Sequence, residues 1–83
     1  MREEEAEKAE NAGFTFMCNA IQIRCLYGKG SIEDKKFLHI LDFIYSAWRN
    51  AGYEREYVSG EIRATEQYSK IKEKTMINQF SKN

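Results

Sequence analysis

The feature that most constrains this chain is a segment, residues 31–51, whose polar side chains fall on one narrow stripe. Its polar residues recur at spacings of four and three, which is the repeat of one face of an α-helix. Nearly every other position is apolar, whereas a surface helix usually buries a single apolar stripe. We therefore predict a central apolar helix that is packed on two sides. The polar stripe consists of Lys35, His39, Asp42, Ser46 and Arg49.

Short breaks on either side of this segment divide the chain into three helices. The run Gly28-Lys29-Gly30 indicates a turn, and Ser31 followed by Asp34 has the pattern of a helix N-cap with an acidic capping box. Asn50-Ala51-Gly52 is typical of a helix C-terminus. The sequence thus predicts one all-α domain over residues 1–83, a small three-helix domain whose last three residues fray. Its helices are expected at approximately 3–27, 31–51 and 54–80.

The first helical segment has a second interpretation. Apolar and polar residues alternate over 21–25, which is the period of a β-strand. Residues 14–30 could therefore form a short hairpin in an α+β fold. The abundance of glutamate and alanine before Gly13 favours the helix. Gly13 and Gly60 are the positions at which the two outer helices would be interrupted.

The charges balance overall but not locally, with thirteen Lys and Arg against thirteen Asp and Glu. Residues 1–13 hold five acids and two bases (−3), residues 14–53 five bases and three acids (+2), and residues 54–83 six bases and five acids (+1). Acids in a first helical turn favour the helix dipole. A nucleic-acid-binding protein concentrates positive charge on one face. Since glutamates lie among the basic residues, a small DNA-associated regulator is only the alternative function. Its candidate contacts are Arg63, Lys70 and Lys74.

No pattern in the sequence predicts catalysis or a metal. Gly28-Lys29 lacks two of the four required positions of a phosphate-binding loop. Cys18 and Cys25 lie about 10 Å apart along a helix, which is too far for a disulfide. Together with the single His39 they do not supply the ligands of a zinc site. We expect free, buried thiols, no enzymatic activity, and no cofactor or metal.

The apolar surface of residues 31–51 exceeds what two flanking helices can cover. We expect the remainder to dock on another protein, as a regulator, inhibitor or adaptor, and first of all on a second copy in a homodimer. Buried aromatic residues dominate such interfaces. The candidate interface residues are Phe37, Leu41, Ile44, Tyr45 and Trp48.

The location follows from what the sequence lacks. No apolar run approaches the roughly 18 residues of a membrane span, and the acid-rich opening is the reverse of a signal peptide. We expect a cytoplasmic protein without a membrane partner, and nucleic acid is not the expected partner. No pattern identifies the protein to which it binds.

Overall fold

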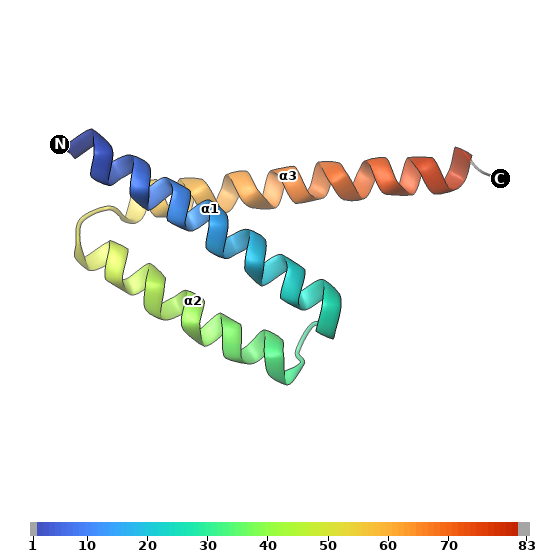
Figure 1. Cartoon of the computed structure of the whole chain (residues 1–83), viewed down its shortest axis with the longest axis horizontal. Coiled ribbons are helices and arrows are strands. Elements are labelled where there is room, and N and C mark those ends of the chain that lie inside the picture. Colours follow the sequence, from blue (N-terminus) through green and yellow to red (C-terminus); the bar gives the residue numbers. More distant parts are fainter. Residues whose placement is uncertain (1, 82–83) are drawn as a thin grey trace.

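Three long helices account for nearly all of the described chain. The computed structural model describes the backbone of residues 2–81 and the side chains of residues 3–70. Each helix end lies within one residue of its expected position, so the predicted all-α, three-helix fold is confirmed. The helices are α1 (Arg2–Tyr27), α2 (Ile32–Asn50) and α3 (Glu54–Ser81) (Figure 1).

The alternative hairpin over residues 14–30 is wrong, because no strand occurs between residues 2 and 81. Ile21 and Ile23 are both half-buried on either flank of Ala20, which is buried. A helix with a buried face this wide produces an apolar–polar alternation over a few residues. The alternation therefore reports the two edges of a helical face, not the two sides of a strand.

The turn between α1 and α2 has the N-cap that its sequence predicts. The Ser31 hydroxyl oxygen accepts a hydrogen bond from the Asp34 backbone N–H at 3.1 Å, so Ser31 caps the helix. The Asp34 carboxylate accepts in turn from the Gly30 N–H at 2.9 Å, one residue before the cap, whereas in the expected capping box it would accept from the Ser31 N–H. Gly28 and Gly30 have φ values of 97° and 82°, a left-handed conformation that favours glycine.

The closest approach in the bundle lies between α1 and α3. A Cβ atom added to Gly13 would lie 2.0 Å from the Tyr57 carbonyl oxygen, and one added to Gly60 would lie 2.0 Å from the Glu10 carbonyl oxygen. The two backbones are thus in direct contact where the helices cross. Both helices run without a break through Gly13 and Gly60, in agreement with the continuous helices expected over 3–27 and 54–80. Because Gly13 and Gly60 have no side chain, the two helices can cross with their backbones in contact.

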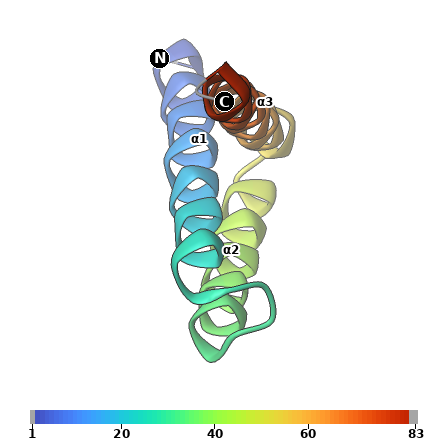
Figure 2. The same ribbon diagram turned by 90° about the vertical axis from the view of Figure 1, so that its right-hand side faces the viewer.

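The core follows this crossing, and α2 is attached to one side of it. Helices α1 and α2 lie antiparallel while α3 crosses behind α1, as Figures 1 and 2 show from two directions. The middle helix contacts both of the others, but only Asp34 and Leu41 of it are buried, so the prediction that it is the central helix is wrong. Within the described residues, no helix has the length and apolar composition needed to cross a membrane. The apolar side chains buried among residues 3–70 are Ala9, Ala20, Leu41, Tyr57 and Ala64.

Candidate functional site

The structure separates the candidate interface residues of α2 into two groups. Leu41 is 8% exposed and belongs to the core of the chain, so its assignment to a partner interface is corrected. Phe37 and Ile44 are half-buried and remain candidates. The sequence showed that α2 had apolar residues on several sides, but not which side the other helices would cover.

Tyr45 and Trp48, also half-buried, already have partners within the chain. The ring of Tyr45 lies 6.0 Å from that of Tyr57 in a tilted arrangement, and its hydroxyl donates a hydrogen bond of 2.5 Å to Glu54 Oε1. This hydrogen bond is the main reason why the pKa of Tyr45 is raised. Trp48 packs edge-on against Tyr53 at 6.1 Å between ring centroids. These aromatic pairs join α2 to Tyr53 and to the first turn of α3. The rings of Tyr45 and Trp48 therefore have less free surface for contact with a partner.

A different set of side chains on α2 faces solvent. Phe43 is 76% exposed and Ile40 is 50% exposed, and Ala47 is exposed one turn further along. Their spacing of three and four places them on one face, opposite Leu41. We call Ile40, Phe43 and Ala47 the outer strip of α2. The sequence contained the signal for this strip in its helical spacing, but the strip became distinguishable only once Leu41 was seen to point inward.

The five residues of the predicted polar stripe are all exposed beside the outer strip, as expected. Two of them, His39 and Asp42, have titratable side chains of the kinds that act in catalysis or bind metals. Both face solvent on a regular helix. Among the described residues there is no group of three or more His, Cys, Asp or Glu side chains that could hold a metal. The prediction that the protein is not an enzyme stays a prediction.

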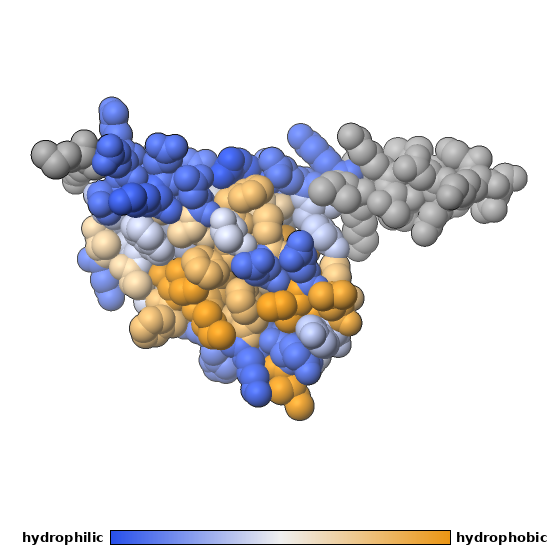
Figure 3. Space-filling model, in the orientation of Figure 1, coloured by the Kyte–Doolittle hydropathy of each residue, from blue (hydrophilic) through white to orange (hydrophobic). Residues whose placement is uncertain are grey.

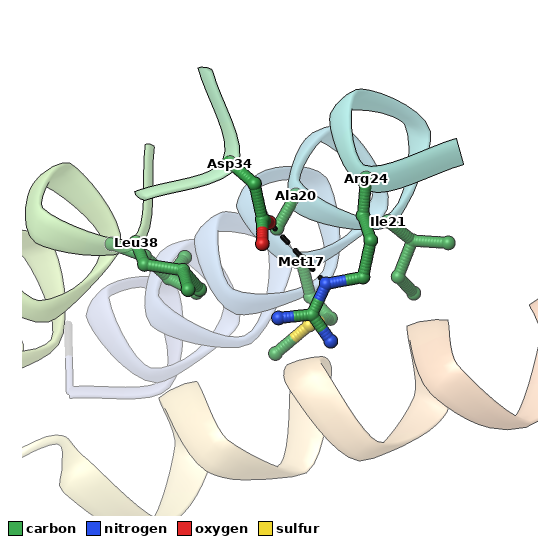
Figure 4. A pocket seen from close by; sticks show the side chains of 7 residues that line it. Met17, Ala20, Ile21, Arg24, Asp34 and Leu38 are labelled. Atoms are coloured by element: carbon green, nitrogen blue, oxygen red, sulfur yellow. Dashed lines mark hydrogen bonds and ion pairs between the residues drawn. The ribbon is translucent and has the colours of Figure 1, made fainter. Parts of the chain in front are cut away.

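A cleft of about 170 Å³ lies between α1 and α2 (Figure 4). Its apolar wall includes Leu38 and Leu41 of α2, and its polar end is an ion pair between Arg24 Nε and Asp34 Oδ1 at 3.3 Å. Asp34 is buried, and its pKa is lowered chiefly by the hydrogen bond from Gly30 and further by Arg24, against the effect of burial. The carboxylate is therefore ionised at neutral pH, and its two oxygens accept hydrogen bonds from Arg24 and Gly30. The Arg24–Asp34 ion pair joins α1 to α2, and we call it the clasp. The remaining lining residues are Met17, Ala20 and Ile21.

A second groove, of about 210 Å³, separates α2 from α3. Glu61 and Tyr45 lie on its walls, and burial raises the pKa of the Glu61 carboxyl. Nearby Tyr57 is fully buried, and burial followed by the charge of Glu61 raises its pKa to about 12. The phenol is neutral at physiological pH. Its hydroxyl has no hydrogen-bond partner among the described residues, so this side chain contributes as an apolar core residue.

Of the residues predicted for the alternative, DNA-binding function, Arg63 is engaged within the chain and is not part of a free basic face. Arg63 pairs with Glu10 Oε1 at 3.5 Å, and its guanidinium lies 4.4 Å above the ring of Phe14. It therefore contributes to the contact of α3 with α1. Lys70 is exposed, and Lys74 lies outside the described side chains. DNA binding stays an untested prediction.

The two cysteines are free, as expected, but they are not buried as a pair. Cys18 is half-buried, whereas Cys25 is exposed. The Cys25 thiol contacts the hydroxyl of Tyr68, and this contact is the largest cause of the raised pKa of Tyr68. The expected burial of Cys25 is wrong, because the last turn of α1 extends beyond the closest part of the crossing.

No protein-family model matches the chain, and neither a curated protein nor a solved structure matches it. The function is therefore argued from the geometry alone.

Proposed function

We propose that this chain is a non-enzymatic helical interaction module, a regulator, inhibitor or adaptor, that docks the outer strip of α2 on a partner protein. The first partner is a second copy of the chain, which gives a homodimer. The proposal rests on one observation, the exposure of large apolar side chains along α2.

The exposed apolar area of α2 is disproportionate to what the helix buries. Within α2, whose side chains are all described, only Asp34 and Leu41 are buried. Leu38 is 39% exposed in addition to the outer strip. Figure 3 shows that, on the face in view, apolar surface gathers over α1 and α2. Contiguous apolar surface of this kind is typical of interaction sites on soluble proteins.

Covering the strip contributes favourable free energy to association. Burying a side chain such as Phe43 completely is worth about 1.5–3 kcal/mol. Two copies related by a two-fold axis would each cover the strip of the other, and Ile40 would contribute similarly. Phe37 and Ile44 lie on the neighbouring flank of α2 and would extend the contact.

The proposal is tested by measuring the mass of the protein in solution across micromolar concentrations with light scattering. We expect a dimer, and we expect Phe43→Ser to weaken the association by about tenfold or more. The matched control is Ile62→Ser, which removes a side chain that is 53% exposed on α3, away from the strip. A folded monomer of 9.8 kDa at every concentration would contradict the homodimer. Equal weakening by both substitutions would contradict the assignment of the strip.

A further inference from the structure

We propose that the end of the bundle formed by the α1–α2 turn docks on an anionic lipid surface. We call residues 26–36 the tip. This inference concerns a different surface and a different kind of partner from the proposed function. It departs from the sequence expectation of no membrane partner, which rested on the absence of a spanning segment and of a signal peptide.

The apolar side chains of the tip are among the most exposed of the described large apolar residues. Leu26 is 77% exposed, Tyr27 is 58% exposed and Ile32 is 69% exposed. Leu26 and Tyr27 end α1, and Ile32 begins α2, so the three flank one turn. Neither helix of the pair covers them. The turn itself is open, because a Cβ atom added at Gly28 or Gly30 would meet nothing within 4 Å.

Basic side chains surround these apolar residues. Lys29, Lys35 and Lys36 are all exposed. Of the two acids in the tip, all of whose residues are described, Glu33 is exposed, whereas Asp34 is buried and paired with Arg24. The tip contains three bases and two acids, a net charge of +1, and Arg24, which neutralises the buried Asp34, lies just outside it.

The opposite end of the bundle has the opposite sign. Residues 1–13 carry a net charge of −3, and the start of α3 adds Glu54 and Glu56 against Arg55. Figure 1 shows the N-terminus of α1 and the start of α3 together at one end, with the α1–α2 turn at the other. The charge is thus separated along the α1–α2 pair. A negatively charged surface would attract the tip and repel the other end.

An anionic bilayer is the partner that uses all of these side chains together. Aliphatic residues such as Leu26 enter the boundary between headgroups and acyl chains, and Tyr27 suits the headgroup level. The lysines can bury their stems while the ammonium groups meet anionic headgroups. A nucleic acid would use the lysines but would offer no apolar region to Leu26 and Ile32. The lipid surface is therefore the better fit.

The test is sedimentation of the full chain with vesicles of phosphatidylcholine, prepared with and without phosphatidylserine. We expect binding only to vesicles that contain phosphatidylserine, and weaker binding as salt is raised. The triple variant K29Q/K35Q/K36Q should lose about a hundredfold in apparent affinity, and L26S/I32S about tenfold. Circular dichroism of each variant verifies that its helices are retained.

The matched control is Ile62→Ser, which removes a side chain that is 53% exposed on α3 and leaves both the tip and the outer strip intact. We expect it to bind the vesicles as the natural chain does. Equal loss by this control, equal binding to neutral vesicles, or no binding to phosphatidylserine would overturn the lipid surface as the partner. The inference would also be wrong if the tip variants disrupted self-association and left vesicle binding unchanged. Failure of the homodimer alone would leave the vesicle result unaffected.

Discussion

The crossing of α1 over α3 and the outer side of α2 are packed in opposite ways. At the crossing the smallest residues, Gly13 and Gly60, bring two backbones into contact and leave no space. On α2 some of the largest apolar residues, including Phe43, face solvent. The comparison shows that the core of this chain is located by close helix approach, not by the most hydrophobic segment. The apolar residues of α2 that the crossing does not cover stay exposed to solvent.

The largest expected effect is that of filling the crossing. Gly60→Ala should destabilise the fold by about 3 kcal/mol or more, because the new Cβ would overlap backbone atoms that cannot rotate away. This loss should outweigh the gain of about 1 kcal/mol from the higher helix propensity of alanine. Urea unfolding followed by circular dichroism measures the change.

Gly28→Ala is the matched control, because nothing lies within 4 Å of the added Cβ and only its left-handed φ of 97° is unfavourable. It should cost about 1 kcal/mol. If Gly60→Ala were as mild as Gly28→Ala, the backbones of α1 and α3 would not be in contact.

The second effect compares the inner and outer sides of α2. Leu41→Ala should destabilise the monomer by about 3 kcal/mol, since it removes a buried side chain and leaves a cavity. Phe43→Ala, on the opposite face, should change the stability of the monomer by no more than about 0.5 kcal/mol. Urea unfolding at low protein concentration, where association is negligible, measures both. A large loss for Phe43→Ala would show that the outer strip is covered within the chain.

The smallest effect concerns the clasp at the α1–α2 turn. The pKa of Asp34 in the folded chain lies below its ordinary value of 3.8. The clasp therefore stabilises the fold fully at neutral pH, and this contribution is lost as the pH falls below 3.8 through the folded pKa. We expect Asp34→Asn to lower the urea midpoint at pH 7, and the difference from the natural chain to narrow at about pH 3.

Glu61 provides a control of opposite sign. Burial raises its pKa above the ordinary value of 4.5, so its ionised form opposes folding at neutral pH. Glu61→Gln should raise the urea midpoint at pH 7, and this gain should fade as the pH falls. Parallel pH profiles for the two variants would contradict the roles assigned to these carboxyl groups.

The sequence predicted the helices well because their signals are local. Ser31 and Asp34 act within one turn of helix, and the polar stripe of α2 depends only on helical spacing. The crossing could not be predicted in this way, because a glycine inside a helix reads locally as a weak point. Only the tertiary contact shows that Gly13 faces the backbone of α3 and that Gly60 faces the backbone of α1.

Only one part of the candidate site could be predicted, because only that part depends on local spacing. Surplus apolar surface on α2 was expected from composition and spacing. The location of this surface on α2 could not be predicted, because helical spacing does not determine which of two apolar sides the other helices cover. Leu41 and Phe43 are both large and apolar and lie two residues apart, yet one is 8% and the other 76% exposed.

The crossing of α1 and α3 also has a consequence for conformational entropy. Glycine and alanine have no side-chain rotamers to lose on folding. The chain therefore forms this helix contact while freezing few rotamers, with Tyr57 as the main exception. In return, the two helical glycines lose more backbone conformational entropy on folding than other residues would. Rotamer-rich side chains such as Leu26 and Phe43 stay in the exposed parts of the molecule, where they can still reorient when a partner surface arrives.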